Sequence, residues 1–114
     1  MKKYSLGLYE KAMPGTLNWK EKLETAKEAG YDFVEISIDA TEEKIARLDM
    51  TKEERFEIIK AMYEVGIPIR TMCVSALTKY SLGNNKEEYC KRGMEILEKS
   101  LQLADDLGIR VVMI

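Results

Sequence analysis

Apolar residues recur along the chain in two spacings, one typical of helices and one typical of buried strands. Helical spacing fills three long segments, and these end at Gly30, Gly66 and Gly108. A β-branched or aromatic run starts within three residues of each glycine, at 33–39, 69–76 and 110–114. With a first alternating segment at 4–9, the pattern predicts a β-loop-α unit that is repeated three times and begun a fourth time.

The predicted helices also carry recognisable starts. Each has an Asn or Thr with a Glu three residues later, the pattern of a capping box: Asn18 and Glu21, Thr51 and Glu54, Asn85 and Glu88. Between strand and helix, residues 41–48 have apolar residues three apart and predict a short helix. Residues 77–84 predict a loop.

Repeats of this kind indicate parallel strands joined by right-handed helical crossovers. Two architectures accept them, an open doubly wound sheet and a closed eight-stranded barrel. In an open doubly wound sheet both faces of a central strand meet helices, so the strand is apolar throughout. The run 33–39 instead alternates apolar residues with Glu35, Ser37 and Asp39, which predicts a barrel wall with a polar interior.

Neighbouring strands repeat this polar face, with Thr71, Cys73 and Ser75 in one and Ser5, Gly7 and Tyr9 in another. Barrel enzymes build their sites at the carboxyl ends of the strands. Tyr9, Glu10 and Lys11 lie where the first strand passes into its loop, and their position favours a role.

Composition narrows the class of protein. The 114 residues are 46% hydrophobic and 33% charged, and the net charge of −2 comes from intermixed Lys and Glu, so we expect neither a nucleic-acid partner nor a membrane. The start Met1-Lys2-Lys3 leads into no apolar signal stretch, and we expect a cytoplasmic protein with unpaired Cys73 and Cys90. Histidine is absent, which leaves carboxylates, lysines, tyrosines or a thiol for any chemistry.

Several recognisable segments occur in order between residues 6 and 114: LGLYEKAMP, DFVEISID with the following RLD, MCVSA, SLG and DLGIRVVMI. Together they resemble one enzyme family, the L-ribulose-5-phosphate (L-xylulose-5-phosphate) 3-epimerases of the xylose-isomerase-like barrel superfamily. The resemblance implies an α/β fold, a partial (β/α)8 TIM barrel holding the first three βα units plus strand four. Residues 1–114 would then be the amino-terminal half of a barrel, a truncated single domain.

Two departures from the family pattern bear on function. Family members carry a histidine and basic residues directly after the third-strand Ser-Ala, where this chain has Leu77, Thr78 and Lys79. The carboxylates and histidine that hold the family's divalent metal and move the proton lie on later strands. The resemblance therefore implies a metal for the full-length family, but none is expected in this chain alone.

The function that follows is the amino-terminal portion of a metal-dependent ketopentose-phosphate 3-epimerase, inactive in isolation. No residue is assigned as a catalytic acid or base or as a metal ligand. The candidate substrate-binding residues lie on the polar strand faces and at the strand ends: Tyr9, Glu10, Lys11, Glu35, Ser37, Ser75 and Lys79.

Each candidate also has a plainer interpretation. Glu35 either binds a sugar hydroxyl or forms an ion pair inside the barrel wall. Small hydroxyl residues such as Ser37 and Ser75 more often only fill space in a strand. Lys11 or Lys79 could meet the substrate phosphate, but barrels most often hold phosphate after strands seven and eight, which favours solvated lysines. Two alternatives to the enzyme fragment stay open, a non-catalytic half-barrel that associates through exposed strand edges and a small open parallel α/β domain.

Overall fold

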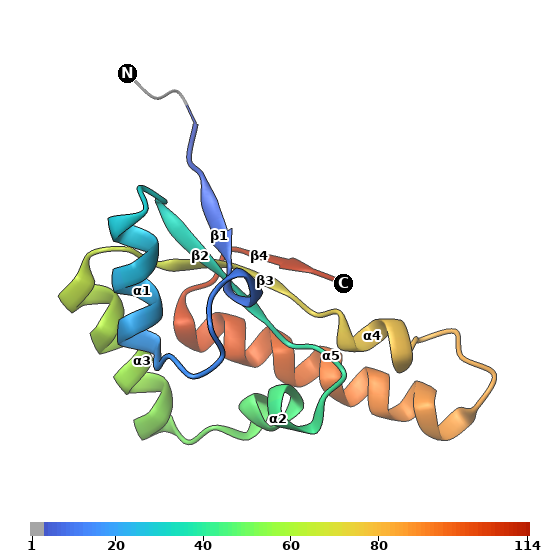
Figure 1. The fold of residues 1–114 in the computed structure, drawn as a ribbon. Coiled ribbons are helices and arrows are strands. Elements are labelled where there is room, and N and C mark those ends of the chain that lie inside the picture. The colour runs from blue at the N-terminus through green and yellow to red at the C-terminus, as the bar shows by residue number, and fades with distance from the viewer. Residues whose placement is uncertain (1–3) are drawn as a thin grey trace.

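A computed structural model describes residues 4–114 as a four-stranded parallel sheet whose long helices lie on one side (Figure 1). The strands are β1 (Gly7–Tyr9), β2 (Phe33–Ser37), β3 (Ile69–Cys73) and β4 (Val111–Met113). The long helices are α1 (Trp19–Glu28), α3 (Lys52–Val65) and α5 (Glu87–Leu107). Short helical turns follow the strands: η1 (Glu10–Ala12), α2 (Glu42–Ile45), η2 (Ala46–Asp49) and α4 (Ala76–Lys79).

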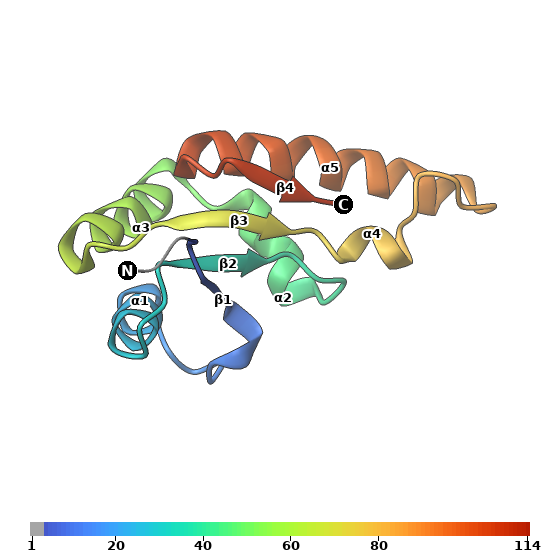
Figure 2. The same ribbon diagram turned by 90° about the horizontal axis from the view of Figure 1, so that it is seen from above.

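The order of the strands decides between the two predicted architectures. They pair in sequence order, β1-β2-β3-β4, and all pairs are parallel. Because right-handed crossovers between successive strands place every helix on the same face, α1, α3 and α5 cover one side of the sheet, as the two views show (Figures 1 and 2). This is the arrangement of a barrel wall, and the predicted partial (β/α)8 architecture is confirmed.

The hydrophobic core lies between the sheet and these helices. Val34, Ile36 and Ile38 are fully buried there, as the alternation of residues 33–39 predicts. The strands meet Leu23 of α1 and Leu103 of α5, both with no exposed surface. The opposite side, which we call the inner face, carries Tyr9, Glu35, Ser37, Thr71 and Cys73.

The capping residues and glycines in the sequence predicted most of the helix ends correctly. Both capping boxes at Asn18 and Thr51 form, with the side chain and backbone bonds reciprocated by Glu21 and Glu54. Gly30, Gly66 and Gly108 all have positive φ, which ends each long helix without the strain that a β-carbon would bring.

Other boundaries differ from the prediction. The Asn85 cap is wrong, because α5 is capped at Lys86 without a side-chain bond and Asn84 accepts from the Lys86 amide instead. The expected loop 77–84 begins with the helical turn α4, and β1 starts at Gly7 rather than at residue 4. Residues 1–3, on which the expectation of no signal peptide rests, lie outside the described residues.

Gly93 allows the loop after β3 to pack closely on α5. The loop residue Tyr80 lies with its carbonyl oxygen where a β-carbon at position 93 would sit, far inside van der Waals contact. Arg92, which precedes Gly93 in α5, donates to the Tyr80 hydroxyl at 3.0 Å and to both carboxylate oxygens of Glu42. One turn of α5 therefore holds the loops that follow β2 and β3.

We expect Gly93→Ala to lower the free energy of unfolding by roughly 1–3 kcal/mol, because backbone atoms must move to admit the methyl group. Chemical denaturation measures the change. Gly83→Ala is the control, since its β-carbon would meet nothing within 4 Å. Equal stability of the two variants would contradict the close packing of Tyr80 on α5.

Candidate functional site

Polar side chains of the inner face meet across neighbouring strands near their carboxyl ends. Tyr9 pairs in register with Glu35, and Glu35 with Thr71. The Tyr9 hydroxyl donates to Ser37 Oγ at 3.1 Å, and the Thr71 hydroxyl donates to Glu35 at 2.7 Å. Within residues 4–114 the partner of Glu35 is thus a hydroxyl rather than the cation of the predicted ion pair.

Lys11 and Asp39 form an ion pair between the loops that follow β1 and β2. Lys11 Nζ lies 2.7 Å from one Asp39 oxygen, and the other oxygen accepts from the Thr41 amide and hydroxyl. Burial raises the pKa of Asp39, but the hydrogen bonds from Lys11 and Thr41 outweigh it and lower that pKa to about 2. The same bond raises the pKa of Lys11.

Glu10 lies on the other side of the sheet, among the helices. Alternation along the strand points Tyr9 inward and Glu10 outward, and Glu10 is only 2% exposed. Its carboxylate accepts from Lys22 and Arg47, both at 2.6 Å, and from Lys44 at 3.3 Å. The Trp19 ring lies under the charges of Lys22 and Arg47.

The Glu10 and Arg47 side chains also bind the backbone of Ser37. The Ser37 amide donates to Glu10 at 2.7 Å, and the Ser37 carbonyl accepts from Arg47 at 2.9 Å. Strand β1 ends at Tyr9, so β2 has no backbone partner on that side beyond Glu35. The two side chains supply the missing bonds and fix Ser37 beside Tyr9.

The cations around Glu10 hold it in the charged form. Burial raises the pKa of Glu10, while hydrogen bonds from Arg47 and Lys22, the charge of Arg47 and the Ser37 amide together lower that pKa to about 2. A buried carboxylate is stable only when paired in this way. Glu10 is therefore a charged support of the strand end, without open access to a ligand.

Ser75 and Lys79 lie apart from the Tyr9 group, at the carboxyl end of β3. Ser75 precedes the turn α4 and lines a hollow of ≈ 250 Å³ together with Cys73, Thr78 and Met113. Lys79 ends α4 and places its ammonium over the Tyr80 ring, 5.2 Å from the centroid. The structure thus groups Tyr9, Glu35 and Ser37, pairs Lys11 with Asp39, and leaves Ser75 and Lys79 at the end of β3.

The site predicted from the sequence does not include Asp39 or Arg47. Asp39 follows β2 and continues its alternation, with Ile38 facing the core, so the sequence pattern was sufficient to place Asp39 beside Glu35 and Ser37. Arg47 lies in the RLD motif, but nothing in the sequence pairs it with Glu10, 37 residues away. Strand alternation alone would have turned Glu10 away from the inner face.

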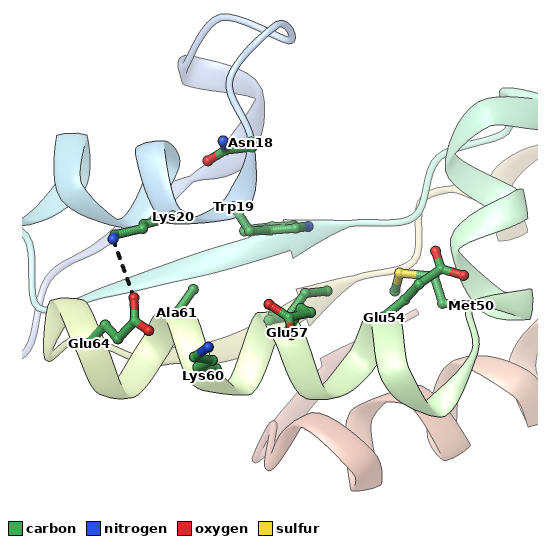
Figure 3. Close-up of a pocket in the computed structure, with 10 residues that line it drawn as sticks. Asn18, Trp19, Lys20, Met50, Glu54, Glu57, Lys60, Ala61 and Glu64 are labelled. Carbon is green, nitrogen blue, oxygen red and sulfur yellow. Dashed lines mark ion pairs between the residues drawn. The ribbon is translucent and has the colours of Figure 1, made fainter.

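The outer surface carries a separate groove between α1 and α3 (Figure 3). It holds ≈ 530 Å³ and is crossed by the ion pair of Lys20 with Glu64 at 3.3 Å. Trp19 and Ala61 line its apolar floor. It shares no lining residue with the inner face, so the two features are distinct.

Two further properties of residues 4–114 bear on the class of protein. No three His, Cys, Asp or Glu side chains come together there as ligands for a metal ion. The residues described therefore do not fit the divalent metal that the resemblance implies. No helix among them is long and apolar enough to cross a membrane.

The fold and the sequence define the class of protein. The sequence model of the xylose isomerase-like TIM barrel family matches residues 23–114, and the chain belongs to this family. Among curated proteins, the L-ribulose-5-phosphate 3-epimerases UlaE of Escherichia coli O157:H7 and Salmonella heidelberg are each 42% identical to it over 111 residues. The alignments cover 97% of this chain and 39% of each relative, so the chain spans about two fifths of their length.

Solved structures agree with this assignment. The apo 3-keto-D-glucoside 4-epimerase YcjR from E. coli superposes with a TM-score of 0.72 at 26% identity, covering 96% of this chain and 37% of that one. A D-psicose 3-epimerase determined in the presence of D-fructose gives a TM-score of 0.75 over 96% and 36% of the two chains. At 17% identity the latter shows the fold alone. The predicted resemblance to sugar epimerases of this superfamily is confirmed.

The network around Glu10 predicts a pH-dependent stability. A folded pKa of about 2 against the ordinary 4.5 means that the stabilisation is complete above pH 4.5 and is lost as the pH falls toward 2. We expect Glu10→Gln to lower the free energy of unfolding by about 3 kcal/mol at pH 7 and to remove this part of the acid dependence. Urea denaturation between pH 2 and 7 measures both effects.

The matched control is Glu87→Gln, an exposed carboxylate on α5 whose side chain is 84% accessible. Because solvent screens that charge, we expect its stability to follow the unmodified chain within about 0.5 kcal/mol. If Glu10→Gln behaved like this control, the network would not support the fold.

Proposed function

We propose that the chain is the amino-terminal portion of a metal-dependent ketopentose-phosphate 3-epimerase that interconverts L-ribulose 5-phosphate and L-xylulose 5-phosphate. The observation that carries this proposal is the 42% identity to UlaE epimerases, which extends over 97% of the chain. Residues 1–114 would form the amino-terminal half of the barrel, in a cytoplasmic enzyme.

The reaction sets what the whole site has to do. A 3-epimerase breaks a C–H bond beside a ketone, and the electron pair moves into an enediolate while a carboxylate takes the proton. A second carboxylate returns a proton to the opposite face of the same carbon. Groups that stabilise negative charge on the enediolate oxygens lower the barrier.

This chain would contribute substrate binding. The Tyr9 hydroxyl is suited to a sugar hydroxyl, and Glu35 is suited to accept from one. Ser37 has no exposed surface and would instead hold the Tyr9 hydroxyl in place at 3.1 Å. Lys11, held by Asp39, would meet a negatively charged part of the substrate. Ser75 and Lys79 would extend the site along the end of β3, and Glu10 would act by holding Ser37.

No acid, base or metal ligand is assigned within residues 4–114. The ion-paired Glu10 and Asp39 are held charged by their cations and are poorly suited to exchanging protons near neutral pH. The metal ligands and the two carboxylates would come from barrel strands beyond β4.

A second candidate function is favoured by the uncovered inner face. This face and the outer edges of β1 and β4 lack a covering layer within residues 4–114. We propose that a non-catalytic half-barrel would associate with a partner through these edges.

The isolated chain is expected to bind the sugar phosphate without converting it. Adding L-ribulose 5-phosphate should shift the amide NMR signals of Ser37 and its neighbours, and no L-xylulose 5-phosphate should form in the presence of a divalent metal. We expect Tyr9→Phe to weaken binding by about 2–10-fold, the effect of one neutral hydrogen bond.

Tyr63→Phe is the matched control, because Tyr63 is 85% exposed on α3 and lies outside the site. Its binding should equal that of the unmodified chain. Turnover by the isolated chain would show that strands beyond β4 are not needed for catalysis. Absence of any shift near Ser37 would remove the binding role of the inner face.

A further inference from the structure

A second hollow on the helical side of the molecule lies between α3 and α5. It holds ≈ 540 Å³, and its apolar lining includes Ile59, Met62, Tyr63 and Pro68. Figure 2 shows α3 between α1 and α5, so both helices that border the hollow are in place, and the outer strands of the sheet take no part in it. The hollow therefore does not depend on what adjoins the edges of the sheet.

A stripe of α3 beside this hollow has the residue spacing of a helix–helix contact. Lys52, Phe56, Ile59 and Tyr63 follow one another at intervals of four, three and four positions, which places them on one face of the helix. Phe56 is 61% exposed and Tyr63 is 85% exposed. Aromatic side chains that remain in water on one helix face are typical of an interaction surface.

The rim of the hollow carries negative charge. Asp105 and Asp106 lie in the last turn of α5, where the helix dipole favours cations, and this turn has no basic residue. Asp106 accepts from Arg55 at 2.6 Å and from Gln102 at 3.0 Å, whereas Asp105 forms no ion pair within residues 4–114. The hollow is thus suited to a partner that brings a cation beside an apolar side chain.

The stripe of α3 itself presents this combination. Lys52 is exposed at the start of α3, one helical turn before Phe56, and within the described part of the chain it forms no ion pair. We propose that a second copy of this chain binds here, around a two-fold axis that sets the two α3 helices antiparallel with Phe56 of each opposite Ile59 of the other. Lys52 of each copy then reaches Tyr63 and Asp105 of its partner.

The antiparallel arrangement is the one that makes this surface complementary to itself. Lys52 and Tyr63 are the first and last residues of the stripe, so reversing one helix places each ammonium at the other copy's aromatic ring and at the free carboxylate of Asp105. The Phe56 ring enters the hollow beside Ile59 as a ridge enters a groove. Parallel helices would instead bring the two lysines together and the two carboxylates together. A two-fold contact of this kind uses the same patch on both copies.

Charge reversal at the two ends of the contact tests the proposal. We expect Lys52→Asp or Asp105→Lys to raise the dimer dissociation constant by about tenfold or more, because each variant puts like charges at both symmetry-related contacts. An equimolar mixture of the two variants should recover the dimer, because both contacts then join opposite charges. Light scattering over a concentration series measures the mass of the unmodified chain, of each variant and of the mixture.

Both reversals leave the helices themselves in favourable electrostatic surroundings. Lys52→Asp brings an anion to the first turn of α3, and Asp105→Lys brings a cation to the last turn of α5. Thermal denaturation should therefore show no loss of fold in either variant. Glu87→Lys, at an 84% accessible side chain in the first turn of α5, is the control and should leave the dissociation constant unchanged.

Three results would overturn the inference, which goes beyond the proposed function and does not rest on it. They are an unmodified chain that is monomeric at every concentration, a mixture of the two variants that stays monomeric, and a dimer that survives both reversals. The last result would show that another surface, such as the edges of the sheet, holds the copies together. Sugar binding at the inner face would be untouched by all three.

Crosslinking then locates the contact. Chains with Cys73→Ser, Cys90→Ser and Phe56→Cys should be joined in pairs by a short bifunctional thiol reagent, because the two-fold axis passes close to this position. A chain that carries Glu24→Cys on α1 in place of Phe56→Cys should stay single. Equal yields from the two chains would overturn the contact through α3.

Discussion

The carboxylate of Glu10 is the interaction on which the carboxyl end of the sheet depends. It is nearly inaccessible to solvent, and it joins η1, α1, α2 and η2 through Lys22, Lys44 and Arg47. Because it also accepts from the Ser37 amide, it extends β1 by one hydrogen bond beyond the end of its backbone ladder. A neutral or shorter side chain would leave the cations without their anion and Ser37 without its support.

Strand alternation accounts both for the ion-pair network on the helix side of the sheet and for the polar side chains of the inner face. Successive residues of a strand face opposite sides, so Tyr9 and Glu10 separate into an inner and an outer partner of the same residue, Ser37. The Tyr9 hydroxyl binds the Ser37 side chain while Glu10 and Arg47 bind its backbone. The candidate site and the ion-pair network are therefore one assembly built on both sides of β2.

The helix ends and the strand alternation could be predicted from the sequence because they depend on residues that are close together in the chain. The capping boxes, the glycines that end the helices and the alternation around Val34 are all local, and each formed as expected. The long-range contacts were not predictable in the same way, because Glu10 meets Arg47 only after the strands are paired. Asn85 is not the cap because the helix begins one residue later, with Lys86 in the capping position.

The same alternation explains why the inner face, and not the helix groove, carries the candidate site. The groove between α1 and α3 is lined by residues that also hold the two helices together, such as Trp19 and Ala61. The inner face gathers hydroxyls and a carboxylate that contribute little to the core, in strands that could have been apolar on both sides. Polar residues there lower the stability of an uncovered sheet very little, since water solvates them. In a closed barrel the same side chains would line a polar cavity, while the core between the sheet and the helices would stay unchanged.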